Sequence, residues 1–233
     1  MAQRPVFLPA ADSGLVDEAM VEFEWFPGFA VVQKQRSIES LHAAAIETLG
    51  VGRLLESSTK SPDPLGVRLS AFNLSVEVDG ESSPVLLEAA FQGSKVFATH
   101  GPFTHLYEVK DGRAVKRFMN ELPDDQLTGF RFEGRDWPLS PRTAFYDWLY
   151  LQSLREIVGQ DDQVEEAIFG VDGFTDIEFN PEKSINCQAR SSALFVALTK
   201  NGTLTDALTD PDAFIEVLTS HGYGIEPVQG QLL

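Results

Sequence analysis

Residues able to do acid–base and binding chemistry recur at helical spacing along the segment LLEAAFQGSKVF, residues 86–97. On a helical wheel of about 100° per residue, Phe91, Gln92 and Lys95 fall within about 60° of Glu88, and small or apolar residues cluster opposite them. A large aromatic side chain in the middle of a polar stripe suits the wall of a pocket. The alternative is an ordinary amphipathic helix with one Glu–Lys pair.

A second concentration of polar residues follows a predicted strand or extended loop, in the segment GFTDIEFNPEKSINCQAR, residues 173–190. Its candidate site residues are Asp176, Asn186 and Arg190. The segment ends at the start of a predicted helix, where unpaired N–H groups and the helix dipole attract anions. We expect Asn186 and Arg190 to hold a phosphate-bearing ligand there. The alternative is that Asn186 caps the helix and Arg190 pairs with a nearby acid.

Other kinds of chemistry are less favoured. Cys187 is the only cysteine and lies in an apolar helical pattern, which is typical of a small core residue rather than a nucleophile. The four histidines are scattered without the spacing of metal ligands, and there is no glycine-rich phosphate loop. We therefore expect neither a metal nor a cofactor.

The 233 residues, 43% of them hydrophobic and 23% charged, predict a folded chain of one large domain or two small ones. No apolar run approaches the ~20 residues that cross a bilayer, and the amino terminus does not resemble a signal peptide. With a single cysteine, this composition favours a cytoplasmic protein that does not bind a membrane.

The balance of charge is strongly acidic, because 35 Asp and Glu face 18 Lys and Arg, a net charge of −17. Such a field repels nucleic acid and argues against general binding of the phosphate backbone. It permits a small local basic site, a basic protein partner, or mimicry of a nucleic acid.

The elements that must position these residues follow from periodicity and turn signals. Alternation predicts strands at 19–26 and 74–78, and a hairpin at 129–137 around Glu133-Gly134. Helices are predicted at 37–49, 86–97, 140–158, 161–169, 185–202 and 211–222. Ser37 and Ser140 are expected to cap two of them, SPDPLG at 61–66 is expected to form a stiff turn, and the tail after about 224 is expected to fray. Together these patterns predict a compact, mainly helical α+β domain with short strands and hairpins.

Three motifs combine into a family resemblance. LSAF at 69–72, Asp79-Gly80 and E-x-x-F-Q-x-x-K at 88–95 resemble the signature of the NADAR family, also called YbiA-like. The chain departs from that signature at Ala89 and Ala90, where the family has His and Tyr, and it lacks a later WG pair. The resemblance covers roughly residues 65–200 and implies a single domain over 1–233, with an amino-terminal strand–helix extension at 1–64 and a carboxyl-terminal helix and tail at 203–233.

Two further stretches, FNPEKSINCQARS and TAFYDWLYL, resemble the branch of NADAR proteins encoded beside DarT-type DNA ADP-ribosyltransferase toxins. This resemblance implies an antitoxin that removes ADP-ribose from modified guanine bases in DNA and has the toxin as a possible partner. Other branches resemble N-glycosidases that act on riboflavin-pathway intermediates. A third reading is a non-catalytic acidic antitoxin that binds the toxin directly.

The resemblance also implies roles for the candidate residues. Cleavage of an N-glycosidic bond passes through an oxocarbenium-like centre, which a carboxylate stabilises or supplies with activated water. Glu88 would do this, Lys95 would keep it ionised, and Asp176 would be the second acid. The expected substrate-binding residues are Ser70, Phe72, Phe91, Gln92, Trp148, Asn186 and Arg190.

Overall fold

The computed structural model describes residues 1–10 and 14–224. Its first elements are β1 (Ala2–Pro9) and β2 (Val16–Phe23), which pair antiparallel along their whole length, from Ala2 opposite Phe23 to Pro9 opposite Val16. The strand predicted at 19–26 is therefore confirmed in part, a few residues early. β1 was not predicted, because its two prolines disfavour a central strand.

The remaining strands are short. They are β3 (Leu54–Glu56), β4 (Ser75–Val76), β5 (Val85–Leu86), β6 (Lys95–Phe97), β7 (Leu127–Phe132), β8 (Arg135–Trp137) and β9 (Gly173–Thr175). The helices are α1 (Val31–Leu49), α2 (Pro64–Arg68), α3 (Leu87–Gly93), η1 (Thr104–Glu108), α4 (Gly112–Glu121), α5 (Ala144–Gln160), α6 (Asp162–Phe169), α7 (Gln188–Lys200), α8 (Leu204–Ala207) and α9 (Pro211–Ser220).

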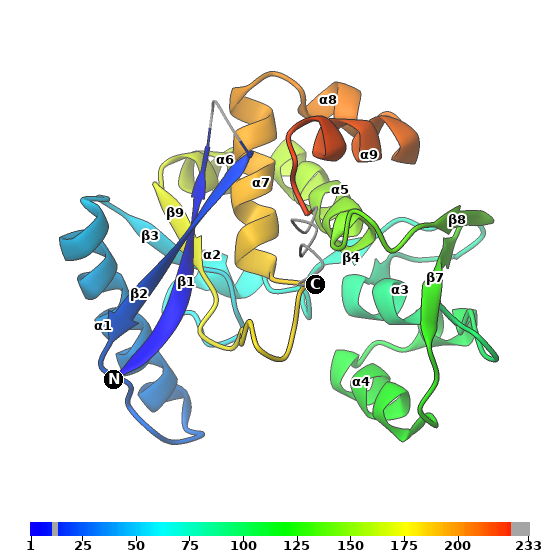
Figure 1. The fold of residues 1–233 in the computed structure, drawn as a ribbon, viewed down its shortest axis with the longest axis horizontal. Coiled ribbons are helices and arrows are strands. Elements are labelled where there is room, and N and C mark those ends of the chain that lie inside the picture. Colours follow the sequence, from blue (N-terminus) through cyan, green and yellow to red (C-terminus); the bar gives the residue numbers. More distant parts are fainter. Residues whose placement is uncertain (11–13, 225–233) are drawn as a thin grey trace, which may run out of the picture.

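One sheet has the strand order β2-β1-β9-β3, in which β9 is antiparallel to β1 and parallel to β3 (Figure 1). The parallel register sets Glu56 opposite Thr175. Residues separated by more than a hundred positions in the sequence thus meet at one end of two strands. This end of the sheet supplies part of the candidate site.

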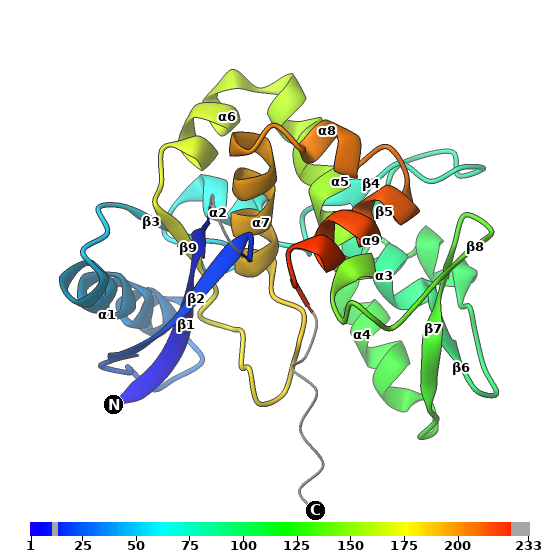
Figure 2. The ribbon, with the colours of Figure 1, turned by 45° about the horizontal axis from the view of Figure 1, so that its top comes forward.

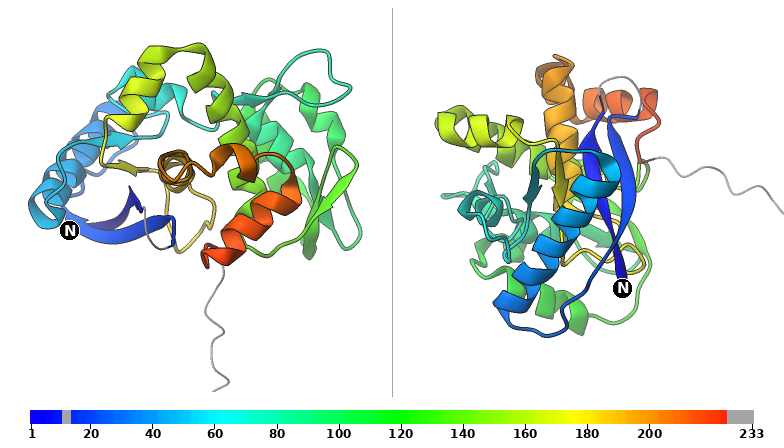
Figure 3. Two further views of the ribbon diagram at one scale, coloured as in Figure 1. Left: turned by 90° about the horizontal axis from the view of Figure 1, so that it is seen from above. Right: turned by 90° about the vertical axis from the view of Figure 1, so that its left-hand side faces the viewer.

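α7 runs through the middle of the molecule and packs on both β1 and α5 (Figures 2 and 3). Nearly all of its residues from Ala189 to Leu198 are buried, as are those of α5 from Ala144 to Leu154, and such stretches are stable only when other elements surround them. The main core extends from Phe7 near the amino terminus to Tyr223. The fold is a single compact domain of mixed helix and strand with more helix than strand, as the sequence predicted.

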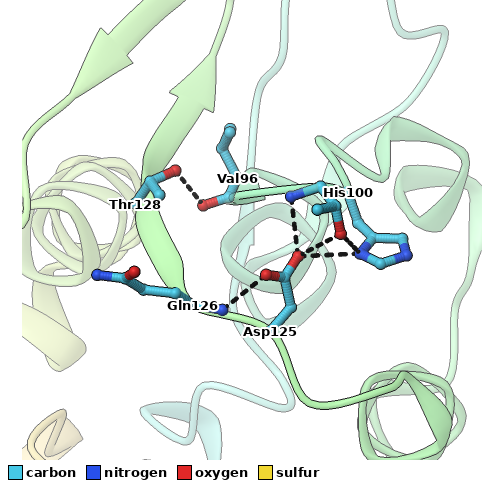
Figure 4. A network of polar contacts seen from close by, with 6 residues as sticks. Val96, His100, Asp125, Gln126 and Thr128 are labelled. Carbon is cyan, nitrogen blue, oxygen red and sulfur yellow. Dashed lines mark hydrogen bonds and ion pairs between the residues drawn. The ribbon is translucent and has the colours of Figure 1, made fainter.

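The other side of the molecule holds α3, α4 and the sheet β6-β7-β8 (Figure 1). Near the loop before β7, Asp125 accepts hydrogen bonds from the Thr99 backbone N–H (2.9 Å), the Thr99 hydroxyl (2.8 Å) and His100 Nδ1 (3.0 Å) (Figure 4). These bonds, the one from His100 foremost, hold the pKa of Asp125 below its usual range. The network fastens the segment after β6 to the start of β7.

Several predicted elements are confirmed. The hairpin at 129–137 forms from β7 and β8 and turns at Glu133 and Gly134, which both have positive φ. Asp161 caps α6, and Asp210 caps α9. Gly50 ends α1 with φ 69°, a left-handed conformation that glycine adopts without strain.

Other predicted boundaries are wrong. The helix predicted at 86–97 ends at Gly93, because Lys95 pairs with Phe130 as the first residue of β6. α1 begins six residues before Ser37, whose buried hydroxyl accepts the Phe26 N–H (3.0 Å) instead of capping. α5 begins at Ala144 rather than Ser140, and α7 at Gln188 rather than 185.

Some helices of the structure have no counterpart among the predicted elements. α4, η1 and α8 were not predicted, and the predicted turn at 61–66 runs into α2, which Asp63 caps by accepting the Leu65 N–H. The predicted frayed tail lies outside the described residues. Within residues 1–10 and 14–224, no helix is both long and apolar enough to cross a membrane.

Candidate active site

A cavity of about 330 Å³ brings together most of the candidate residues from five segments of the chain. We call it the central cavity. It is lined by Ser70, Ala71, Phe72, Glu88, Phe91, Gln92, Lys116, Tyr146, Asp176, Glu178, Phe179, Asn180, Lys183, Ser184, Asn186 and Gln188. Seven of the ten candidate site residues are on this lining: Ser70, Phe72, Glu88, Phe91, Gln92, Asp176 and Asn186.

Glu88 lies in the first turn of α3 and is 5% exposed. One of its carboxylate oxygens accepts a hydrogen bond from Gln92 Nε2 (3.0 Å), one helical turn further on. The same oxygen is 3.8 Å from Lys116 Nζ on α4. A buried carboxylate is stable only when such partners replace the water that it loses. The two partners fix the direction in which Glu88 presents its charge.

Lys95 lies on β6, just beyond α3, and its Nζ is 5.2 Å from the centre of the Phe91 ring. Burial lowers the pKa of Lys95, and the negative charge of Glu88 acts against that shift. Lys95 therefore lies over the Phe91 ring and interacts electrostatically with Glu88, although it does not line the central cavity.

Asp176 follows β9 and is 7% exposed. Its Oδ1 accepts the backbone N–H groups of Glu178 (3.0 Å) and Phe179 (3.2 Å). Burial, and after it the negative charge of Glu56, raises the pKa of Asp176 to about 8. Near neutral pH the side chain is a neutral acid at the wall of the cavity.

Glu56 is a second buried carboxylate, 1% exposed, on the strand beside Asp176. It accepts hydrogen bonds from the hydroxyls of Ser58 (2.6 Å) and Thr175 (2.7 Å) and from the Ile177 N–H (2.8 Å). Burial raises the pKa of Glu56 as well. The three hydrogen bonds are shared between both Glu56 oxygens and stabilise its anionic form, whereas the two backbone bonds to Asp176 both reach Oδ1. Of the two carboxyl groups, Asp176 is therefore the one that holds a proton.

His42 extends this network away from the cavity. Its Nε2 is 2.8 Å from Thr175 Oγ1. Because the Thr175 hydroxyl donates its one proton to Glu56, His42 must donate to Thr175. Burial lowers the pKa of His42 to about 4, so the imidazole is neutral near pH 7. No positive charge therefore neutralises Glu56 from this side.

Asp176→Asn is expected to stabilise the protein at alkaline pH. The folded-state pKa of Asp176 lies above its ordinary value, so the folded state holds a proton that the unfolded state releases, and stability is lost as pH rises toward 8. The melting temperature of the wild type should fall between pH 5 and pH 8 by more than that of the variant. If the melting temperatures of the wild type and the variant change equally with pH, the raised pKa of Asp176 is contradicted.

Tyr146 and Gln188 complete the wall. Gln188 Oε1 accepts the Ala71 N–H (2.8 Å), and its side chain also bonds to Asp176, which ties the 70–72 segment to the acid. Burial foremost, with the charge of Glu88 among lesser causes, raises the pKa of Tyr146 well above its ordinary value. Its hydroxyl is therefore a permanent neutral donor at the cavity.

Trp148 and Arg190 do not reach the central cavity. Trp148 packs on Trp137 and Phe214, because it lies two residues, about 200°, from Tyr146 around α5. The Arg190 guanidinium stacks 4.4 Å above the Tyr223 ring and lines a neighbouring cavity of about 440 Å³. Asn186 and Arg190, which were expected to hold one ligand together, therefore line two different cavities.

Several residues at or beside the site were not among the candidates, and Lys116, Glu56 and Tyr146 show why. Lys116 lies on α4, which was not predicted, and Glu56 becomes part of the site only through the pairing of β3 with β9. Tyr146 could have been found, because it lies in a predicted helix and in the stretch TAFYDWLYL that carried the resemblance. Among the described residues, no three His, Cys, Asp or Glu side chains converge as metal ligands.

Comparison with known protein families identifies a match over nearly the whole described chain. The family described as DarT1-associated NADAR antitoxin matches residues 2–224, nearly the whole chain. The matched range includes every lining residue of the central cavity. No curated protein matches the chain.

Proposed function

The chain belongs to the DarT1-associated NADAR antitoxins, and we propose that it is an antitoxin enzyme that hydrolyses the N-glycosidic bond between ADP-ribose and guanine in DNA. The observation that carries this proposal is the pairing, in one cavity, of the Glu88 carboxylate with the neutral acid Asp176. Hydrolysis of a glycosidic bond uses two carboxyl groups in opposite protonation states.

The proposed step conserves atoms and charge. The bond between the ribose anomeric carbon and the guanine nitrogen breaks, and its electron pair stays on the nitrogen, which takes the proton of Asp176. A water molecule adds its oxygen to the anomeric carbon and gives a proton to Glu88. Solvent then returns one proton to Asp176 and removes the other from Glu88. The products are ADP-ribose and intact guanine.

The surrounding residues have matching tasks in this proposal. Gln92 and Lys116 hold Glu88 in one orientation, so that its charge is in place before the positive centre develops. The Lys95 ammonium balances the same charge from behind Phe91. Tyr146 and Asn186 offer donors to the sugar. The modified base enters the cavity from a single strand or after rotation out of the duplex.

The direct test is incubation of the purified protein with ADP-ribosylated DNA and, in parallel, with phosphoribosyl-pyrimidine intermediates. We expect ADP-ribose to be released from the DNA and the second substrate to remain intact. Hydrolysis of the small intermediates alone would assign the protein to the riboflavin-linked N-glycosidases. Turnover of neither substrate would contradict the enzyme proposal.

Free ADP-ribose is expected to stabilise the protein against heat. A product that binds only the folded state adds RT ln(1 + [L]/Kd), about 2.7 kcal/mol at a hundredfold excess over Kd. The exposed Lys183 lines the central cavity and would contact the diphosphate, so Lys183→Ala should reduce the shift in melting temperature.

Arg190→Ala is the matched comparison for that measurement. It also removes one cation, but from the neighbouring cavity, and should lower the melting temperature of the free protein by losing its stacking on Tyr223. The shift produced by ADP-ribose should be unchanged. A shift that depends on Arg190 and not on Lys183 would move the diphosphate to the neighbouring cavity.

A further inference from the structure

A second cavity, of about 510 Å³, adjoins the central cavity, and basic residues outnumber acids on its lining. We call it the basic cavity. Four basic side chains line it, Lys60, Lys110, Arg113 and Lys116, against two acids, Asp111 and Glu178. The chain as a whole has about two acids for every base. This excess of positive charge is therefore a local reversal of the overall field, and it attracts anions.

The basic residues are held in different ways. Lys110 Nζ donates to the Ser83 hydroxyl (3.2 Å) and the Pro84 carbonyl (3.0 Å), which fixes the ammonium at the rim and leaves one donor for a ligand. Within the part of the chain that the structure describes, Lys60 Nζ donates to the Thr59 hydroxyl (3.2 Å) and to no other group. The exposed Arg113 guanidinium, on the first turn of α4, has no ion-pair or hydrogen-bond partner within the described residues.

One of the two acids is already committed. Asp111 accepts the Arg113 backbone N–H (2.9 Å) as the cap of α4, and its other oxygen is 3.6 Å from Arg117. Its charge is thus partly balanced by Arg117, and that of Lys116 by Glu88. Within residues 1–10 and 14–224, neither Lys60 nor Arg113 has an acidic ion-pair partner. With Lys110 they give the basic cavity its excess of positive charge over Glu178.

The position of this cavity indicates what it binds. It shares Phe72, Lys116 and Glu178 with the central cavity, so a ligand there continues directly from the reacting centre. Two anionic parts of the proposed substrate extend away from the reacting centre: the diphosphate of ADP-ribose and the phosphodiester strand of the DNA. In the proposed function, Lys183 on the lining of the central cavity contacts the diphosphate. The strand is left for the basic cavity.

Resting on the proposed function, we propose that Lys60, Lys110 and Arg113 bind the phosphodiester backbone of the DNA strand next to the modified base. The protein then contacts only the few phosphates beside the adduct, and the acidic remainder of its surface repels the rest of the DNA. The same distribution of charge, a small basic cavity on an acidic protein, therefore favours binding of the adduct and weakens binding of unmodified DNA.

The test compares the double variant Lys60→Gln/Arg113→Gln with the control Arg155→Gln/Lys200→Gln. Both remove two positive charges. The control residues are exposed and lie on α5 and at the end of α7, far from α4 (Figure 1). Each protein is assayed on an ADP-ribosylated single strand and on ADP-ribosylated deoxyguanosine, which has no strand.

We expect the ratio of kcat/KM on the strand to kcat/KM on the nucleoside to fall about tenfold in the Lys60/Arg113 variant and to stay constant in the control. The dependence of log kcat/KM on log[salt] should become shallower by about 1.4, since each phosphate contact on a single strand contributes about −0.7. The wild type should lose on the order of tenfold activity between about 50 and 200 mM salt, which corresponds to two or three contacts.

Three results would overturn the proposal. Equal losses on strand and nucleoside would assign the basic cavity to the diphosphate of the adduct. Unchanged kcat/KM on both substrates, with an unchanged salt dependence, would show that the cavity binds no phosphate. If the wild type is inactive on both substrates, the proposed function fails. The strand site is then tested by measuring how tightly the two double variants bind the adduct-free strand at low salt. Equal affinities would overturn the strand site as well.

Discussion

Glu88→Gln lowers the release of ADP-ribose from modified DNA by about 10²- to 10⁴-fold in kcat and leaves the protein folded. This is the range over which a single positioned carboxylate contributes to acid–base chemistry. The amide has nearly the shape of the carboxylate and can still accept the hydrogen bond from Gln92. It loses only the charge that the positive centre and the attacking water require.

The stability of this variant should change little, because the lost ion pair involves Lys116, whose side chain is half exposed. Glu178→Gln is the matched control: it removes one acid from the lining of the same cavity without touching Glu88. Activity should remain within a few fold in the control. A folded Glu88→Gln protein with wild-type turnover would remove Glu88 from the mechanism.

The same variant separates an enzyme from a binding antitoxin. If Glu88→Gln still neutralises the toxin at ordinary expression, neutralisation depends on binding, through the acidic surface or by imitating DNA. If protection is lost together with turnover, the antitoxin acts through catalysis. The two readings therefore differ in one growth assay that uses a protein already shown to be folded.

The parts of the fold that sequence analysis recovered are those determined by local physics. α5 and α7 are long apolar helices, and the hairpin of β7 and β8 turns at residues suited to positive φ, so short-range patterns are enough. α4 was missed because its sequence, GRAVKRFMNE, starts with a glycine after an aspartate and reads as a turn. Lys116 could not be placed at the site without it.

The remaining site positions depend on pairing between segments that are distant in the sequence. Lys95 has helical spacing from Glu88, but its pairing with Phe130 on β7 overrides that local preference, so it meets Glu88 from a strand. Glu56 lies in LLESS, which matches no motif, and it approaches Asp176 only because β3 and β9 align in parallel. Arg190 does not join Asn186 on the central cavity, because α7 begins at Gln188 and Asn186 therefore precedes the helix instead of lying one turn before Arg190 on it.

The pH dependence of the reaction tests the pairing of Glu56 with Asp176. If neutral Asp176 supplies the proton to the leaving base, kcat/KM should fall as pH rises through about 8, because that is where the acid loses its proton in the free enzyme. Asp176→Asn should lower kcat by about 10²- to 10⁴-fold and remove the alkaline decline, since the amide has no proton to lose.

Glu56→Gln should move the alkaline decline to lower pH. Apart from burial, the charge of Glu56 is the largest cause of the raised pKa of Asp176, so its removal lets Asp176 ionise earlier and lowers activity most near pH 7 to 8. Glu178→Gln removes a charge that raises the same pKa less, and its shift should be smaller and in the same direction. A purely structural role for Glu56 would lower activity equally at every pH. A wild-type profile that stays flat from pH 6 to 10 would show that the proton of the leaving base comes from a group other than Asp176, and the acid would then have to be sought in Tyr146, whose hydroxyl remains protonated over that range.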